Sequence, residues 1–316
     1  MCGIVGFFDK RPDAGTGAEG VGAPVGKIVL SLLTALGRRG PDSAGAAVYG
    51  DPEGLVVRVK LGERGDLAPR GAEVAERARA LTRVKATNIQ GHYLRLVVEA
   101  LGEIRSFEAA LEMVHPEVEV VSVGRRLEIM KELGSPANLE TTFRLSAFTG
   151  SHGIGHTRLS TESRVDLSHS QPFWAHGTLD LAIVHNGHIT NYHKLRRRYE
   201  QRGIRFYTEN DSEVIGIYVA DRMAQGLPFD EALRASVRDL DGSFSFLAAT
   251  AEALGYAKDP FCLKPLIVAE TEEFVAVANE EIALSTTFEG TLETREPSNR
   301  RVQAWFLPRR KRRQAA

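Results

Sequence analysis

Cys2 is the residue of this 316-residue chain with the clearest chemical potential, because only Met1 precedes it. A small second residue favours removal of the initiator methionine, so we expect Cys2 to carry both a thiol and a free α-amine. An α-amine has a pKa of ~7.7–8.0 and can accept a thiol proton near neutral pH. Amino-terminal threonine nucleophiles use their own amine in this way. The sequence therefore predicts a nucleophile with its own base, and the plain alternative is a small hydrophobe that starts a strand.

Four further residues have the side chains that attack on a carboxamide requires. A thiolate that attacks the side-chain amide of glutamine creates an oxyanion, which Asn186 and Gly187 could meet with a carboxamide N–H and a backbone N–H. Arg158 could hold the α-carboxylate of a free amino acid in a bidentate fork, and Asp211 could pair with its α-ammonium. Each residue type alone is commoner as structure than as a ligand. By themselves they indicate only an amide hydrolase with an N-terminal thiol.

Short apolar segments and amphipathic segments must position these groups. The patterns predict strands at 2–8, 46–49, 55–61, 153–160, 179–185, 243–250, 265–269 and 274–278. They predict helices at 27–36, 192–202 and 211–223, with a glycine- and proline-rich loop at 9–26. Because Asp51-Pro52-Glu53-Gly54 is a turn sequence, we expect 46–49 and 55–61 to pair as a hairpin.

The character of the chain changes between residues 63 and 146. We predict a small α/β insertion there, with helices at 71–85, 106–114 and 127–133 and extended segments at 92–98 and 118–123. This stretch offers no nucleophile, metal cluster or glycine-rich phosphate loop. Packing or partner docking is therefore its expected role.

Composition and charge restrict the classes of function. The formal net charge of −1 gives no global field that would attract nucleic acid or a membrane. The basic C-terminal tail at 300–316 contains the run Arg309-Arg310-Lys311-Arg312-Arg313, which no aromatic or glycine-rich recognition pattern accompanies, so we expect this run to be a solvated end or a docking arm for an acidic partner. The two cysteines, Cys2 and Cys262, and the lack of a signal segment indicate a reducing, cytoplasmic setting. No apolar run approaches the ~18 residues of a membrane span.

Histidines are concentrated in one part of the sequence, with seven between His152 and His193. His152 and His156 are four residues apart, a spacing that zinc sites use. No adjacent carboxylate or cysteine completes a ligand set, so we expect no metal site.

Five motifs, in this order, resemble those of the class II glutamine amidotransferases, whose glutaminase domain is an N-terminal nucleophile hydrolase. The motifs are Cys2-Gly3-Ile4-Val5-Gly6, Arg39-Gly40-Pro41-Asp42-Ser43-Ala44-Gly45, Gly155-His156-Thr157-Arg158-Leu159-Ser160-Thr161, His185-Asn186-Gly187 and Asn210-Asp211-Ser212-Glu213-Val214. The resemblance covers 1–62 and 150–290. It implies an α+β fold, the four-layer αββα sandwich of that superfamily, with 63–146 as a small α/β insertion in a single domain at 1–316.

The resemblance also implies a role for each matched residue. Cys2 would be the nucleophile, and Asn186 with Gly187 would form the oxyanion hole. Arg158 and Asp211 would hold the amino-acid end of L-glutamine. The remaining substrate-binding candidates, which would line the pocket, are Thr161, Arg39 and His185. The segment 259–266 also matches a family motif, except that Cys262 replaces the usual glycine.

The family's larger members continue into an acceptor domain, which this sequence lacks. A freestanding glutaminase with such an insertion resembles the amidotransferase subunit of glutamate-synthase-like enzymes, including N-methylglutamate synthase. The resemblance implies a hetero-oligomer in which separate synthase subunits receive ammonia. It implies no cofactor in this chain, and flavin and iron–sulfur centres in the partners. The alternatives are a glutaminase subunit for another acceptor, a module that senses glutamine without cleaving it, and a thiol hydrolase of another amide.

Overall fold

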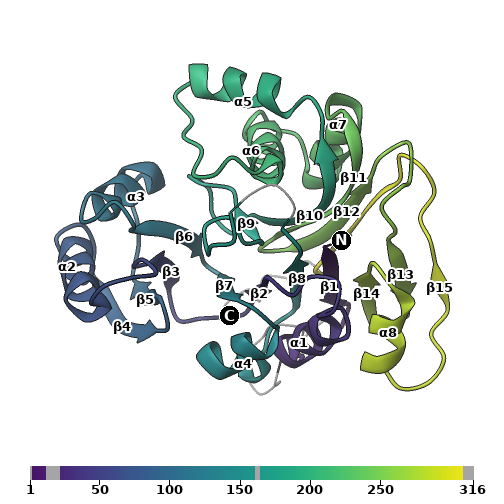
Figure 1. Cartoon of the computed structure of the whole chain (residues 1–316), viewed down its shortest axis with the longest axis horizontal. Helices are drawn as coiled ribbons and strands as arrows, with labels where there is room; N and C mark the ends of the chain where they lie inside the picture. The colour runs from purple at the N-terminus through teal and green to yellow at the C-terminus, as the bar shows by residue number, and fades with distance from the viewer. Residues whose placement is uncertain (1, 12–21, 161–163, 309–316) are drawn as a thin grey trace, which may run out of the picture.

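The computed structural model describes residues 2–11, 22–160 and 164–308. They form three antiparallel sheets with helices on their outer faces (Figure 1). The strands are β1 (Gly3–Asp9), β2 (Ser43–Tyr49), β3 (Leu55–Lys60), β4 (Val84–Gln90), β5 (Tyr93–Val98), β6 (Glu119–Gly124), β7 (Leu127–Leu133), β8 (His152–Arg158), β9 (Phe173–Trp174), β10 (Ala182–Ile189), β11 (Gly242–Thr250), β12 (Ala253–Lys258), β13 (Ile267–Glu270), β14 (Phe274–Ala278), β15 (Thr294–Arg295) and β16 (Val302–Phe306). The α-helices are α1 (Val25–Ala35), α2 (Leu67–Arg79), α3 (Ile104–Glu112), α4 (Ala137–Phe143), α5 (Tyr192–Gln201), α6 (Asp211–Ala224), α7 (Phe229–Asp239) and α8 (Glu281–Thr287).

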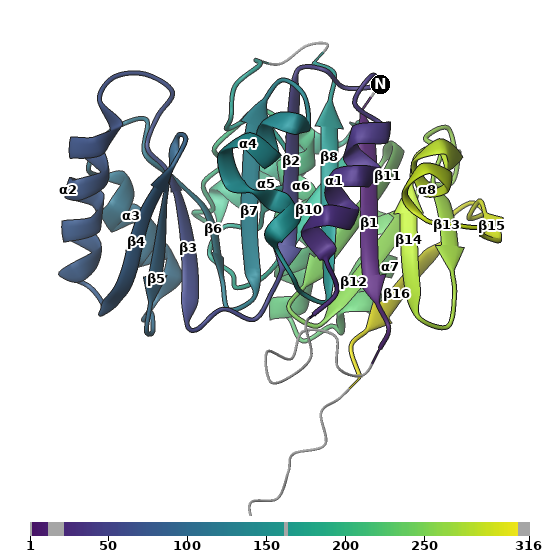
Figure 2. The same cartoon turned by 90° about the horizontal axis from the view of Figure 1, so that it is seen from below.

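Two sheets lie face to face at the centre of the molecule. The first has seven strands in the order β15-β13-β14-β1-β8-β2-β7, and the second has five in the order β16-β12-β11-β10-β9. β1 and β8 pack against β10 and β11, while α1 and α8 cover the outer face of the first sheet. α6 and α7 cover the outer face of the second sheet (Figure 2). The layers therefore run helix, sheet, sheet, helix, and each of the two sheets is covered by helices on one face and by the other sheet on the other face.

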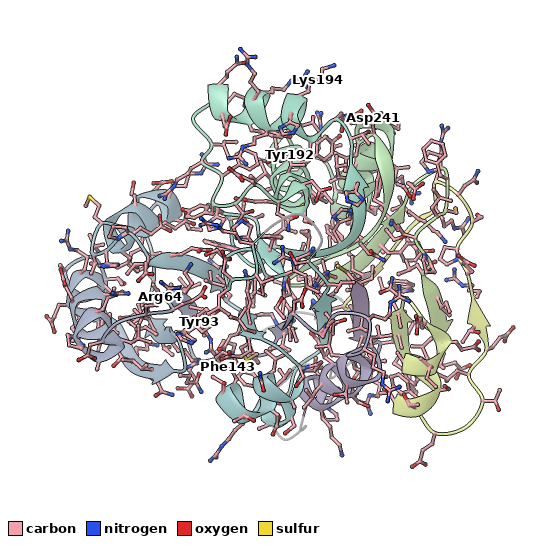
Figure 3. The ribbon with its side chains drawn as sticks, in the orientation of Figure 1. Arg64, Tyr93, Phe143, Tyr192, Lys194 and Asp241 are labelled. Carbon is pink, nitrogen blue, oxygen red and sulfur yellow. The ribbon has the colours of Figure 1, made fainter. Side chains whose placement is uncertain are left out.

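A third sheet, in the order β4-β5-β3-β6, carries α2 and α3 and lies beside the sandwich (Figure 1). Its apolar residues, among them Val57 and Val120, belong to the same core cluster as Ile4 of β1. Tyr93 of β5 and Phe143 of α4 face one another across this junction, with ring centroids 5.8 Å apart (Figure 3). The boundaries 63–146 for an insertion stay a prediction.

The hairpin expected between 46–49 and 55–61 is wrong. β2 pairs with β7 and β8 in the seven-stranded sheet, whereas β3 pairs with β5 and β6 in the four-stranded sheet. Every residue of β2 and β3 is buried, so each strand lies inside a sheet and has a partner along both edges. The turn sequence at 51–54 therefore carries the chain from one sheet to another.

The helix expected at 127–133 is also wrong, because this segment is strand β7. Its leucine, glutamate, methionine and lysine favour a helix, but helix propensity is a weak preference. All seven residues pair with β2, from Leu127 opposite Tyr49 to Leu133 opposite Ser43. The ladder and the burial of the strand outweigh the local preference.

Candidate active site

Cys2 stands at the start of β1, next to the end of β8. Gly3 pairs with Thr157, so the residue that precedes Gly3 lies beside Arg158. The Cys2 Sγ is 3.8 Å from the carbonyl oxygen of Leu159. β1 is the central strand of the seven-stranded sheet, so the residue that carries the thiol directly precedes a strand with a partner on each side.

Arg158 places a buried positive charge next to this thiol. Only 3 % of the residue is exposed, and its Nη1 donates a 2.8 Å hydrogen bond to the carbonyl oxygen of Arg164. Burial lowers the pKa of Arg158, while the negative charge of an ionised Cys2 acts in the opposite direction. An arginine remains cationic despite such a shift, so Arg158 can stabilise a thiolate or bind a carboxylate.

Arg39 and Asn279 hold the backbone at the start of β1. The Nε of Arg39 donates to the carbonyl oxygen of Cys2 at 3.4 Å, and its Nη1 pairs with Glu280. Asn279 accepts from the amide of Ile4 through Oδ1 and donates to the carbonyl oxygen of Pro265 at 3.0 Å through Nδ2. Asn279 was not predicted from the sequence, where its only signal is a polar residue directly after an apolar strand.

The Arg-Gly-Pro-Asp segment fixes the end of β8. A Cβ at Gly40 would lie 2.4 Å from the amide nitrogen of Arg158, so only glycine allows this close approach. The amide of Asp42 donates to the carbonyl oxygen of Arg158 at 3.0 Å, and its carboxylate accepts from the amide of Ser160 at 2.7 Å. The position of the Arg158 guanidinium is therefore fixed by hydrogen bonds of its backbone as well as by those of its side chain.

Asn186 and Gly187 lie on β10, in the sheet that faces β1. Asn186 is 4 % exposed, and its Nδ2 has no hydrogen-bond partner among the residues that the structure describes. Gly187 has a φ of 142°, and a Cβ there would lie 2.1 Å from the carbonyl oxygen of Ser243. The glycine is required by this backbone shape. A buried amide N–H without an internal acceptor is a donor that a bound ligand can use.

A hydrogen-bonded network joins this strand to the first turn of α6. His185 Nδ1 lies 2.8 Å from Ser212 Oγ and 3.8 Å from Asp211 Oδ1. The amide of Ile189 donates to Asp211 Oδ2 at 2.7 Å. Gln171 Oε1 accepts from the amide of His185 at 2.6 Å, and its Nε2 donates to Ser212 Oγ at 3.2 Å. The Asp211 carboxylate is therefore held at the end of the strand that carries Asn186.

His156 is a buried histidine of β8, and neither of its ring nitrogens has a hydrogen-bond partner among the described residues. Burial, together with the nearby positive charge of Arg158, lowers its pKa to about 3, so the ring is neutral. Burial also lowers the pKa of His185. The structure thus brings Cys2, Arg158 and His156 together on one sheet and places His185 and its network opposite. Neither neutral ring competes with Arg158 for an anion.

Three further predictions from the sequence concern Thr161, a metal site and a membrane span. Thr161 lies outside the described residues. Within the described ranges, no group of three or more His, Cys, Asp or Glu side chains could hold a metal ion. The structure gives no helix in those ranges the length and apolarity needed to cross a membrane.

Cys262, which replaces the glycine usual in the family motif at 259–266, has the backbone conformation that a glycine would favour. Its φ is 55°, in the left-handed region. The fully buried Asp259 accepts from the amides of Phe261 at 2.6 Å and Cys262 at 3.1 Å, which closes the turn. The turn therefore forms with a side chain in a strained position.

Comparison with known proteins adds to this geometry. Residues 156–286 match a family model described as "Glutamine amidotransferase domain". The chain is 36% identical over 290 residues to "Glutamine amidotransferase-like protein GlxB" of Rhizobium meliloti, covering 90% of this chain and 91% of that protein. It is 35% identical over 292 residues to a "Putative glutamine amidotransferase" of Methanothermobacter thermautotrophicus, covering 90% and 93%.

Among solved structures, the chain is similar to glutamine phosphoribosylpyrophosphate amidotransferase from B. subtilis, with a TM-score of 0.60 and 20% identity. That likeness covers 97% of this chain and 49% of the other, so the chain spans about half of the solved neighbour. Such a structural match at low identity shows the fold alone, and the fold is the layered α/β sandwich that the motifs predicted. The chain belongs to the glutamine amidotransferase family, as an enzyme of class II.

Proposed function

We propose that this amidotransferase hydrolyses L-glutamine to glutamate and ammonia at Cys2, and delivers the ammonia to a separate glutamate-synthase-like partner. The observation that carries the proposal is the arrangement around the thiol. Cys2 lies beside the buried Arg158 on one sheet, and the facing sheet presents the Nδ2 of Asn186 without an internal acceptor.

The chemistry uses the amino-terminal residue twice. The Cys2 amine takes the thiol proton, and the thiolate attacks the side-chain carbonyl carbon of glutamine. Asn186 Nδ2 and the amide of Gly187 donate to the resulting oxyanion. The intermediate collapses as the C–N bond breaks, and the amine returns its proton to the departing ammonia. Water, activated by the same amine, then hydrolyses the γ-glutamyl thioester and releases glutamate and the thiol.

The remaining candidates would select a free amino acid. Arg158 would bind the α-carboxylate of glutamine through its fork, and Asp211 would bind the α-ammonium. Thr161 and Arg39 would border the pocket, and His185 would support Asp211 from within the network. A peptide-bound glutamine lacks both of those charges, so it would bind poorly.

The partner half of the proposal rests on the relatives and on the family resemblance. The region shared with the R. meliloti and M. thermautotrophicus relatives covers 91% and 93% of those proteins, which leaves them little room for a second catalytic domain. This supports an acceptor reaction on another polypeptide. N-methylglutamate synthase, with flavin and iron–sulfur centres in its other subunits, is the partner system that we propose.

Two measurements test the proposal. Cys2→Ala should abolish ammonia release while glutamine still binds, and the matched variant Cys262→Ala should retain wild-type turnover. A wild-type enzyme that binds glutamine but never releases ammonia, alone or with its partners, would instead identify a sensor. Affinity capture of the tagged chain from its native cells should yield subunits with the absorbance of flavin, and an acceptor subunit without flavin would contradict the partner assignment.

A further inference from the structure

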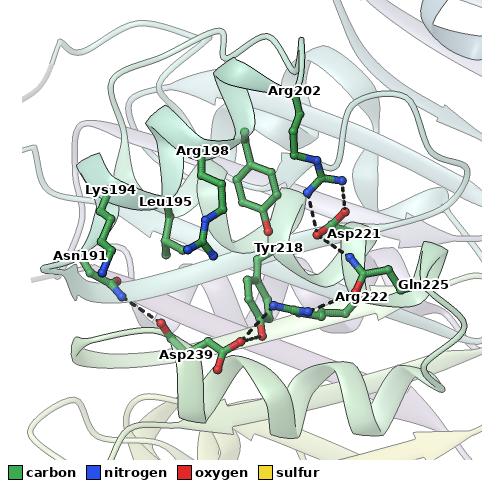
Figure 4. Close-up of a pocket in the computed structure, with 11 residues that line it drawn as sticks. Asn191, Lys194, Leu195, Arg198, Arg202, Tyr218, Asp221, Arg222, Gln225 and Asp239 are labelled. Carbon is green, nitrogen blue, oxygen red and sulfur yellow. Dashed lines mark hydrogen bonds and ion pairs between the residues drawn. The ribbon is translucent and has the colours of Figure 1, made fainter.

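A polar pocket lies on the outer helical layer, and none of the proposed catalytic residues lines it. It has a volume of about 410 Å³ and lies between α5, α6 and the end of α7 (Figure 4). Four basic side chains line it, Lys194, Arg198, Arg202 and Arg222, against two acidic ones. The pocket is therefore positive by two charges in a protein whose formal net charge is −1. Nothing in the proposed glutaminase chemistry uses it.

The two acidic residues are already engaged by two of the arginines. Arg202 forms a fork with Asp221, with contacts of 2.6 and 3.1 Å. Arg222 pairs with Asp239 at 3.1 Å, and Asp239 also accepts from the hydroxyl of Tyr218 at 2.5 Å. These pairs form a polar floor whose charges are balanced. The excess charge of the pocket thus comes from its other cations.

Lys194 and Arg198 supply that excess. Neither makes an ion pair or a side-chain hydrogen bond with any residue in the described part of the chain. They are four residues apart on α5, so they lie on the same face of the helix. Figure 4 shows both side chains extending from α5 into the same space, with Tyr218 and Asp239 on its opposite side.

A third donor lies in the wall of the pocket. Tyr199 is only 2 % exposed and lines the pocket, yet its hydroxyl has no hydrogen-bond partner among the described residues. Burial raises the pKa of Tyr199 to about 12, so the hydroxyl keeps its proton and can donate. The hydroxyl oxygen itself is not fully buried, so water or a ligand in the pocket can accept its hydrogen bond.

We propose that this pocket binds a small molecule through a phosphate or diphosphate group. Three separate donors, the ammonium of Lys194, the guanidinium of Arg198 and the hydroxyl of Tyr199, converge on one space. A phosphate presents three terminal oxygens, one for each donor, whereas a carboxylate presents two. Charge-assisted hydrogen bonds of this kind are about twice as strong as neutral ones.

Isothermal titration calorimetry of the full chain with inorganic pyrophosphate at low ionic strength tests the proposal. Arg198→Gln should weaken binding about tenfold or more, since a hydrogen bond to a charged group contributes roughly 1.5–3 kcal/mol. Lys194→Gln should weaken it to a similar degree, and Tyr199→Phe about threefold. Arg197→Gln removes an equally exposed charge from the same helix outside the pocket, and should change binding less than about twofold.

Several results would overturn the assignment. They are no binding of pyrophosphate up to about 10 mM, equal loss in Arg197→Gln and Arg198→Gln, or malonate binding as tightly as pyrophosphate. Binding of a poly-glutamate peptide with no response to pyrophosphate would also overturn it, and would identify a docking surface for an acidic protein segment. Because the readout is binding, the result is independent of whether Cys2 hydrolyses glutamine.

Discussion

At the scale of single residues, the proposed chemistry depends on the buried Nδ2 of Asn186, which has no hydrogen-bond partner among the described residues. A buried polar group without a partner costs about 1–3 kcal/mol. A protein retains such a group where a bound species makes the missing hydrogen bond, and the oxyanion of the proposed reaction would do so. Gly187 adds to the site a backbone shape that only glycine adopts without strain.

The proposed role of Asp211 is a single ion pair with the α-ammonium of glutamine. Asp211→Asn keeps the size of the side chain and an acceptor for the amide of Ile189, but removes the charge. We expect KM for glutamine to rise about 10- to 100-fold with kcat nearly unchanged, since hydrogen bonds to charged groups contribute roughly 1.5–3 kcal/mol.

Steady-state kinetics with glutamine over a wide concentration range separates the two constants. The exposed neighbour Glu209 provides the control, because Glu209→Gln removes a nearby charge without touching the network. A large fall in kcat of the Asp211→Asn enzyme at unchanged KM would refute a binding role for Asp211.

The contribution of Cys262 to stability depends on its left-handed backbone conformation and not on its side chain. A residue with a side chain in the left-handed region costs about 1–2 kcal/mol, which glycine avoids. Cys262→Gly should therefore raise the free energy of unfolding by up to about 1 kcal/mol, after the larger unfolded-state entropy of glycine is subtracted. Urea denaturation measures this change.

Leu263→Gly is the control, because Leu263 is the exposed next residue and its φ is not positive. That substitution should lower the free energy of unfolding by about 0.5–1 kcal/mol. If Cys262→Gly destabilises the protein to the same extent, the strain at Cys262 does not exist.

Among single residues, the motif positions could be predicted and the supporting positions could not. Cys2, Arg158 and Asp211 are recognisable because their order along the chain is distinctive. Gln171 and Asn279 are not, because their roles depend on backbone groups of His185 and Ile4, which are remote in sequence. A lone amide side chain after a strand does not reveal which backbone group it will meet.

At the scale of elements, α3 contacts the turn that follows β9 through the carboxyl group of Glu108. Glu108 is 4 % exposed and accepts from the amide of Gly177 at 2.9 Å. Burial raises the pKa of Glu108 to about 7. Burial lowers the pKa of His176 to about 3, so this neighbouring ring is neutral and provides no counter-charge.

The pH dependence follows from the raised pKa. In the folded protein the Glu108 carboxyl group keeps its proton up to about pH 7. In the unfolded chain the same group loses its proton near the ordinary pKa of a glutamate. The stabilisation is therefore complete below the unfolded pKa and is lost as pH rises through about 7. Between pH 6 and pH 8 the wild-type free energy of unfolding should fall by about 1 kcal/mol relative to Glu108→Gln.

Denaturant unfolding of both proteins at several pH values checks this difference. Glu73→Gln, an exposed change on α2, should leave the pH profile as it is in the wild type. Parallel profiles for the wild type and Glu108→Gln would contradict a titration of Glu108 in this range.

Most of the elements follow from local patterns, and the two errors share one cause. Helices 27–36, 192–202 and 211–223 were predicted close to α1, α5 and α6 because their apolar residues recur on one face. β2 pairs with β7 and with β8, and both pairings join segments more than 75 residues apart in sequence. Local composition carries no information on such pairing.

At the scale of the whole molecule, the third sheet and the seven-stranded sheet share one apolar core. Val59, Leu96 and Val123 belong to the same cluster of buried residues as Val5 and Leu247. A continuous core couples the unfolding of its parts, so β3–β6 should unfold together with β1 and β8, not as a separate unit.

Native-state hydrogen exchange tests this coupling. The slowest amides of β6 and of β1 should report opening free energies that agree within about 1 kcal/mol. Opening of the third sheet at a much lower free energy, with β1 still protected, would instead describe an independently folding unit.

The central claim is that Cys2 becomes the amino terminus and forms a thioester with the glutamyl group. Mass spectrometry of enzyme quenched in acid during turnover of isotope-labelled L-glutamine tests this most directly. We predict an amino-terminal peptide that begins at Cys2 and carries the labelled γ-glutamyl group on sulfur. Active enzyme that retains Met1, or a label on any other residue, would contradict the account.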